Sequence, residues 1–230
     1  MKRLLIGLVT VALSASAALA AAPAPTPTPA APAAQPNNDP PVRYDWQGNH
    51  KKATEALNKR DFPTAIKLFT EILDSGRLPK TWLAPTLYFR GKAYRSSRQY
   101  DKAIEDYEAA VKADPKMDVA YFEMGMALQS KNQHAKAASS FGQAIAIKGN
   151  ADYYYGRCVS HSWTGNFSAA ISDCETASRM RPGNADWLGT LGRLYEDGGQ
   201  KQRAIETYRR AIAINPNQAE ARDGLKQLVK

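Results

Sequence analysis

Small and aromatic residues recur along this chain at a constant spacing, and this recurrence limits its possible folds more than any other feature. The segment YFRGKAYRSSRQYDKAIEDYEAAVKADP, residues 88–115, carries Gly91, Tyr107 and Ala110. The same residue types return 101 positions later, within residues 191–216, which is close to three periods of about 34 residues. Residues three, four and seven apart share one face of a helix. The spacing therefore predicts helices whose backbones approach closely at the small residues.

Further copies of the pattern fill the rest of this region. One lies around Gly125 and Phe141, another carries Cys158 and Cys174 at the same places, and a weaker first copy includes Ala53. Each copy is expected to form two antiparallel helices, with turns at KRDF, SRQY, KNQH, TGNF and GGQK. Because a single helix pair cannot bury its apolar face, the copies are expected to stack.

This pattern resembles the tetratricopeptide repeat, and its best match is LGRLYEDGGQKQRAIETYRRAIAINP at residues 191–216. The resemblance covers roughly residues 46–230. It implies an all-α, right-handed superhelical solenoid of about five helix-turn-helix units with a concave inner face. The predicted repeats are 46–83, 84–117, 118–150, 151–184 and 185–218, followed by a capping helix over 219–230. Pro85 is expected near the start of a helix, where its missing amide donor costs little.

The N-terminus has the features of an export signal. Residues 1–20 combine Lys2 and Arg3 with an apolar run and a small-residue end at Ala20, which is typical of a cleavable signal peptide. The alternative, an uncleaved membrane anchor, is less favoured because the apolar run is short. Residues 21–44 hold eight of the fourteen prolines and are expected to be a disordered linker. The sequence therefore predicts a periplasmic or secreted protein that does not span a membrane after signal cleavage.

The two cysteines occupy matched places in the fourth repeat. Cys158 takes the glycine place of its first helix, and Cys174 takes the aromatic place of its second helix. Both lie eight residues from Asn166 in the turn, so the two thiols are expected to face each other. An oxidising compartment would join them in a disulfide. The alternative is two buried free thiols.

Catalysis and metal binding find little support in the sequence. The three histidines show no metal-ligand spacing. We expect His161 to be packed, His134 to be solvated in a turn, and His50 to lie on the weak first helix. No nucleophile, base and orienting acid occur in a plausible set, so we expect no enzyme activity, no metal and no cofactor.

The resemblance places a ligand groove on the first helix of each repeat. Copy by copy, this gives an aromatic column of Tyr88, Phe122 and Tyr155, which ends at Gly189. The remaining groove candidates recur at the same repeat spacing: Lys92, Met126, Val159 and Arg193, then Arg95, Gln129 and Ser162, with Trp163 beside the last. Aromatic residues and methionine suit a peptide, and Lys92, Arg95 and Arg193 suit its acidic groups. The alternative is that the aromatic residues pack against neighbouring helices.

The predicted function is a non-enzymatic scaffold or adaptor of the bacterial cell envelope that binds a protein or peptide in this groove. Removal of the signal lowers the net charge from +9 to +7, which favours acidic partners. The alternatives are an adaptor for an anionic cell-wall polymer and, less favoured, an RNA-binding helical-repeat protein. No nucleic-acid partner is expected, and self-association is left open.

Overall fold

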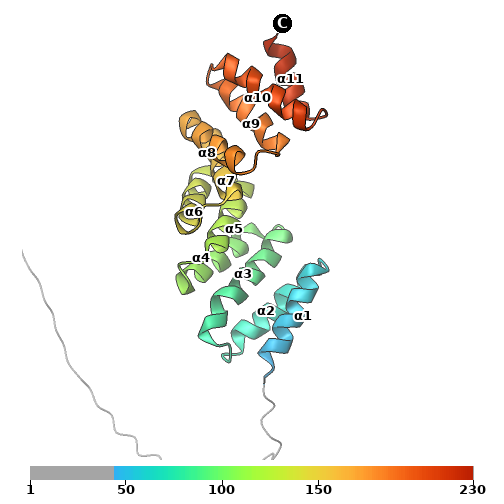
Figure 1. The fold of residues 1–230 in the computed structure, drawn as a ribbon. Coiled ribbons are helices and arrows are strands. Elements are labelled where there is room, and N and C mark those ends of the chain that lie inside the picture. Colours follow the sequence, from blue (N-terminus) through green and yellow to red (C-terminus); the bar gives the residue numbers. More distant parts are fainter. Residues whose placement is uncertain (1–43, 230) are drawn as a thin grey trace, which may run out of the picture. The chain divides into compact units, whose positions relative to one another are not determined.

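The computed structural model describes residues 44–229, which form eleven helices and no strand (Figure 1). The predicted signal peptide at 1–20 and the proline-rich residues 21–43 lie outside the described residues. The helices are α1 (Trp46–Asn58), α2 (Phe62–Asp74), α3 (Lys80–Ser96), α4 (Tyr100–Ala113), α5 (Asp118–Ser130), α6 (His134–Ile147), α7 (Ala151–Trp163), α8 (Phe167–Met180), α9 (Ala185–Asp197), α10 (Lys201–Ile214) and α11 (Ala219–Leu228).

Helices that follow each other in the chain pack against each other throughout the array. The odd-numbered helices also contact one another from repeat to repeat, as α3 does with α5 and α5 with α7. We call these odd-numbered helices the first helices and their side of the array the first-helix face. The even-numbered helices, the second helices, form the second-helix face. This arrangement confirms the predicted all-α helical repeat solenoid.

Glycine and aromatic residues set the distance between helices in each repeat. A Cβ atom added to Gly125 on α5 would lie 2.7 Å from Cε1 of Phe141 on α6. A Cβ atom on Gly156, from the next first helix, would lie equally close to the same ring atom. Phe141 is fully buried. One ring therefore packs between two first helices, and both approach it closely because they lack a side chain there.

The turn within each repeat requires a left-handed residue. The residues with positive φ at this place are Arg60 (62°), Arg98 (62°), Asn132 (58°), Gly165 (75°) and Gly199 (72°). Only the last two are glycines, which adopt this conformation without steric cost. The turn geometry thus recurs in every repeat even where the local residue disfavours it.

Two expectations about helix positions are wrong. Pro85 lies inside α3, which begins at Lys80 after an N-cap at Pro79. The added turn brings Trp82 into contact with Trp46 of α1, with ring centroids 5.2 Å apart, and this packing outweighs the preference of proline for a helix start. His134 is the first residue of α6 and is half-buried, rather than solvated in a turn.

Candidate peptide-binding surface

The three predicted aromatic column residues lie on successive first helices and are half-buried. The ring of Phe122 on α5 lies 4.9 Å from the ring of Tyr153 on α7, measured between centroids. Tyr155 stacks on Trp187 of α9 at 4.8 Å. Tyr88 packs against rings within its own repeat. These are the contacts of the packing alternative, so the column contributes to the array itself and leaves only part of each ring to a ligand.

Polar candidates on this face link first helices of neighbouring repeats. Nε of Arg95 on α3 lies 2.8 Å from a carboxylate oxygen of Glu123 on α5. Gln129 on α5 donates from Nε2 to the carbonyl oxygen of Gly156 and to Oγ of Ser160 on α7, both at 2.9 Å. These bonds run across repeats, so they hold one first helix against the next.

The same kind of link continues towards the C-terminus. The Tyr155 hydroxyl and Oγ1 of Thr190 on α9 are 3.2 Å apart. Nε of Arg193 donates to Glu220 on α11 at 2.7 Å. Arg95 and Arg193 are thus paired within the chain, which leaves their charges less available to a ligand carboxylate.

The other candidates remain accessible on this face. Nζ of Lys92 lies 5.6 Å from the centroid of the Tyr88 ring, and no carboxylate of residues 44–229 forms an ion pair with it. Met126 and Val159 are half-buried. Trp163 is 71% exposed. The surface therefore offers one unpaired ammonium group, two aliphatic side chains and one exposed indole ring.

Burial controls the ionisation of the tyrosines along this face. Burial, together with the nearby Glu123 carboxylate, raises the pKa of Tyr88 to about 12. Burial also raises the pKa of Tyr153, whose hydroxyl donates to Asp118 at 2.8 Å. Both hydroxyls are therefore neutral hydrogen-bonding groups at physiological pH, and neither can serve as a base.

The two cysteines lie together in the core of the fourth repeat. Cys158 and Cys174 are fully buried, their Cα atoms are 5.4 Å apart, and their sulfur atoms are at bonding distance. They hold the places that Gly125 and Phe141 hold one repeat earlier. The paired sulfur atoms therefore fill the space between the two helices that an aromatic ring fills elsewhere.

His50 occupies an aromatic cluster at the N-terminal end of the array. Its ring lies 5.3 Å from Phe69, 5.1 Å from Trp82 and 5.6 Å from Phe89, measured between centroids, and it is only 9% exposed. Burial lowers the pKa of this imidazole. The cluster joins α1, α2 and α3, so His50, which lies on the first helix as predicted, is part of the core.

The remaining histidines also have structural surroundings. His161 lies 4.0 Å from Asp173, and burial lowers its pKa more than this carboxylate raises it. His134 stacks on Trp163 at 5.2 Å. Across residues 44–229, no three His, Cys, Asp or Glu side chains gather where they could hold a metal ion. Likewise, no described helix has the length and apolar character needed to cross a membrane.

The second-helix face carries a feature that the sequence analysis missed. Arg90 on α3 makes two hydrogen bonds of 2.8 and 2.7 Å to Asp106 on α4 and reaches Thr70 on α2 at 3.2 Å. Arg157 on α7 pairs with Asp173 on α8 in the same way, at 2.8 Å twice. Each pair joins a first helix to the second helix of its own repeat, and the bond to Thr70 also ties Arg90 to the preceding second helix. The signal in the sequence was an Arg and an Asp 16 residues apart, in two alternate repeats.

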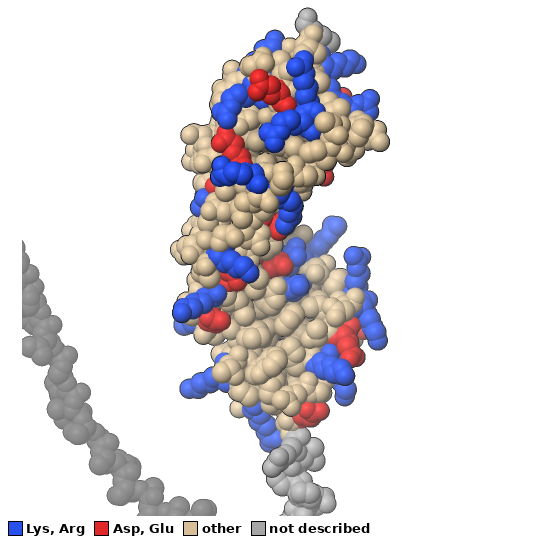
Figure 2. All heavy atoms as spheres, viewed as in Figure 1, with Lys and Arg blue, Asp and Glu red and all other residues tan. Residues whose placement is uncertain are grey.

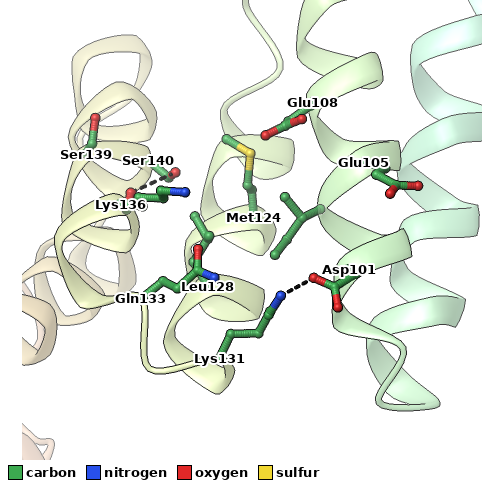
Figure 3. A pocket seen from close by; sticks show the side chains of 11 residues that line it. Asp101, Glu105, Glu108, Met124, Leu128, Lys131, Gln133, Lys136, Ser139 and Ser140 are labelled. Carbon is green, nitrogen blue, oxygen red and sulfur yellow. Dashed lines mark hydrogen bonds and ion pairs between the residues drawn. The ribbon is translucent and has the colours of Figure 1, made fainter.

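A groove opens between second helices where this pair is absent. In the third repeat, Met124 and Ser140 stand at the positions that the paired Arg and Asp hold in the second and fourth repeats. Above α5, a groove of about 440 Å³ lies there between α4 and α6. Figure 3 shows Glu105 and Glu108 on one side of this groove and Lys136 on the other. Over α9, between α8 and α10, a second groove measures about 420 Å³. We call them the α4–α6 groove and the α8–α10 groove.

Comparison with known proteins identifies the family. Profiles described as tetratricopeptide repeat match residues 84–117, 119–150 and 164–228. Tetratricopeptide repeat protein 28 of Homo sapiens is 37% identical over 97 residues, which is 42% of this chain and 4% of that protein. Hsp70-Hsp90 organizing protein 1 of Glycine max is 24% identical over 179 residues, 77% of this chain and 29% of that protein. The chain thus spans less than a third of these relatives.

Solved structures show the same fold. MamA aligns with a TM-score of 0.68 and 24% identity, covering 76% of this chain and 94% of MamA. YrrB, described as a TPR protein with an unusual peptide-binding site, aligns with a TM-score of 0.69 and 19% identity, covering 79% of this chain and 92% of YrrB. Together with the profile matches and the repeated glycine–aromatic packing, these likenesses lead to one conclusion: the chain belongs to the tetratricopeptide repeat family.

Proposed function

We propose that this chain is a non-enzymatic scaffold that binds a protein or peptide on its first-helix face. The observation that carries the proposal is the series of bonds between first helices, such as Arg95 to Glu123 and Gln129 to Ser160. Because these bonds hold the surface in one arrangement, little ordering is needed when a ligand binds. The names of two similar proteins, an Hsp70-Hsp90 organizing protein and a TPR protein with a peptide-binding site, support the same function.

The accessible groups indicate which peptide fits. Trp163 supplies exposed aromatic area, and Met126 adapts to irregular apolar partners. Lys92 has an unpaired charge that suits one acidic side chain or a C-terminal carboxylate. The proposed ligand is therefore an extended or helical segment with apolar side chains and at least one carboxylate.

Crosslinking inside cells tests this assignment. A photoreactive residue at position 126 or 159 is expected to capture a partner, whereas one at position 105, on the second-helix face, is not. The Lys92→Glu/Trp163→Ala variant changes two accessible side chains and should fold normally by circular dichroism, yet lose at least tenfold in capture. Equal capture from position 105, or undiminished capture by the folded variant, would refute binding on the first-helix face.

We further propose that the protein acts in the bacterial cell envelope. The support is the signal-like sequence of residues 1–20 followed by the proline-rich segment. Cell fractionation with N-terminal sequencing of the recovered protein tests this directly. Recovery outside the cytoplasm with a new N-terminus after Ala20 is the expected result, and a cytoplasmic protein that retains residues 1–20 would contradict it.

An oxidised Cys158–Cys174 pair follows from the same setting. The two sulfur atoms lie at bonding distance in a fully buried position, and the envelope outside the cytoplasm is oxidising. We expect protein unfolded without reductant to show no reactive thiol, and reduction to lower its unfolding free energy by about 3 kcal/mol. Two reactive thiols before reduction would show that the cysteines are free.

A further inference from the structure

The α8–α10 groove combines an apolar floor with basic walls. Leu191 and Tyr195, both from α9 and each only 4% exposed, lie at its base, and Arg179 of α8 and Arg210 of α10 line its walls. Figure 2 shows Lys and Arg gathered over the C-terminal helices on the face in view. The groove has the same place in its repeat as the α4–α6 groove, but the walls of the latter carry Glu105 and Glu108. The two grooves thus have similar volumes and differ in charge.

Two of the arginines in the α8–α10 groove have free charge. A third arginine, Arg203, pairs with Glu175 at 2.5 Å and lies 4.2 Å above the Tyr195 ring. Arg179 makes only one long hydrogen bond, of 3.3 Å, to a threonine of its own helix. Within residues 44–229, Arg210 has no ion-pair partner. The charges of Arg203 and Glu175 cancel each other. The guanidinium groups of Arg179 and Arg210 remain on opposite walls of the groove, unpaired within the described part of the chain.

A buried hydroxyl in the same groove lacks a hydrogen-bond partner. Ser178 lines the groove, is 5% exposed, and its Oγ forms no hydrogen bond. Other repeats have apolar residues at this register, namely Val111, Ile145 and Ile212. A buried hydroxyl without a partner is destabilising, but this Oγ is itself enclosed, so a ligand atom reaches it only if neighbouring side chains move. The hydroxyl places a polar group at the base of this groove where other repeats have an apolar one.

We propose that the α8–α10 groove binds an acidic peptide segment, with its carboxylates on Arg179 and Arg210. Guanidinium groups pair with carboxylates in a bidentate geometry. A peptide is favoured over a polyanion without apolar groups, because such a polymer would leave the exposed edge of Leu191, 4% of that residue, uncovered. This site lies on the second-helix face and is separate from the proposed binding surface on the first helices.

The Arg–Asp pair of the preceding repeat provides a design for a variant that fills this groove. Residues 191 and 207 stand where the Arg157–Asp173 pair stands one repeat earlier. The Leu191→Arg/Thr207→Asp variant introduces that native pair, leaves the net charge unchanged and is expected to fill the groove. The Arg179→Gln/Arg210→Gln variant removes the two free charges, and both side chains are exposed, so its fold should be unaffected. The matched control is Glu105→Gln/Glu108→Gln in the α4–α6 groove.

Fluorescence anisotropy with the full chain gives the test. The probe is a labelled peptide in which glutamates flank leucines, and its counterpart has glutamine in place of each glutamate. We expect the glutamate peptide to bind at least tenfold more tightly than the glutamine peptide at 0.15 M salt. Both groove variants should lose at least tenfold in affinity, while the control binds as the unchanged protein does.

Three results would overturn the proposal. The first is equal affinity for the two peptides. The second is unchanged binding by the Arg179→Gln/Arg210→Gln variant, which remains decisive even if the Leu191→Arg/Thr207→Asp variant fails to fold. The third is that inorganic polyphosphate binds as tightly as the glutamate peptide and that the same variants abolish its binding. The groove would then be a polyanion site. All of these titrations use the Lys92→Glu/Trp163→Ala background, which removes the accessible ligand groups of the first-helix face, so their outcome is independent of the proposed scaffold function.

Discussion

At the scale of single residues, the array depends on aromatic rings that pack directly against glycines of neighbouring helices. Phe141 lies between Gly125 on α5 and Gly156 on α7. Tyr208 is in contact with Gly192 and Gly224 in the same way, at the C-terminal end. Each ring therefore joins its own repeat to the next one. A methyl group at any of these glycines would have to displace a ring that is almost fully buried.

Substitution of Gly156 tests this packing. In Gly156→Ala, the new methyl group would lie 2.7 Å from Cε1 of Phe141, and overpacking of this kind costs roughly 1–3 kcal/mol. The higher helix propensity of alanine offsets up to about 1 kcal/mol, so the expected net loss in urea unfolding is about 1 kcal/mol. Gly183→Ala is the control, because no heavy atom lies within 4 Å of its added Cβ. Equal stability of the two variants would contradict the packing argument.

The buried imidazole of His50 predicts a pH dependence at the N-terminal end. Burial lowers the pKa of His50 in the folded state. At a pH below the ordinary histidine pKa of about 6.5, the unfolded chain therefore takes up a proton that the folded chain does not. Stability is therefore complete above that pH and falls as the pH decreases through it. The protection factors of the α1 amides, which compare the observed exchange rate with the intrinsic rate at the same pH, should fall between pH 7 and pH 5, and His50→Phe should remove this change. An equal fall in the variant would assign it to another group.

At the scale of elements, the turn inside each repeat is a fixed geometry that different residues satisfy with different strain. Gly165 and Gly199 have positive φ, and a Cβ added to either would meet no atom within 4 Å. Arg60 and Arg98 adopt the same conformation with a side chain, at a cost of roughly 1–2 kcal/mol. The packing of the two helices on either side maintains the turn at these sites.

Two amino-acid substitutions measure this strain. Arg98→Gly should raise the unfolding free energy by up to about 1 kcal/mol, because the left-handed strain is removed. Gly199→Ala should lower it by about 1 kcal/mol for the converse reason. Both follow from urea unfolding monitored by circular dichroism. A loss of stability in Arg98→Gly would show that the greater freedom of glycine in the unfolded chain outweighs the relieved strain.

At the scale of the whole array of residues 44–229, contacts connect almost only neighbouring helices. The last helix, α11, covers the final repeat: Ala221 is fully buried, and Leu225 packs on the core that includes Leu194 and Tyr208. Loss of this cover would expose apolar surface of α9 and α10. Because stability in such arrays is a sum over repeats and their interfaces, the effect should stay near the C-terminus.

The Leu225→Asp variant tests this locality. A carboxylate at the buried edge of α11 should detach the helix at a cost on the order of 2 kcal/mol. Hydrogen exchange should then accelerate in α9–α11 and remain unchanged in α1–α4. Lys226→Asp is the matched control on the exposed side of the same helix. Faster exchange along all eleven helices would mean that the array unfolds as one cooperative unit.

The repeat signature and its geometry were predictable because they are local. Spacings such as Gly91 to Tyr107 define two helices joined by one turn, and the face-to-face position of Cys158 and Cys174 follows from equal distances to that turn. The candidate surface was predicted less well. Glu123 and Glu220, which pair with Arg95 and Arg193, lie on the following first helix, and a repeat-by-repeat alignment does not show which side chains meet across repeats.

The sequence by itself determined the helix pairs, their stacking in chain order and the small residues at which they meet, because these depend on a period that each repeat contains in full. Only the tertiary structure decided which charges are free. Arg90 and Arg157 close their grooves through bonds to aspartates, whereas Leu191 leaves the α8–α10 groove open. The physical reason is that pairing and burial depend on the distance between side chains of different helices, which packing sets and the order of residues does not reveal.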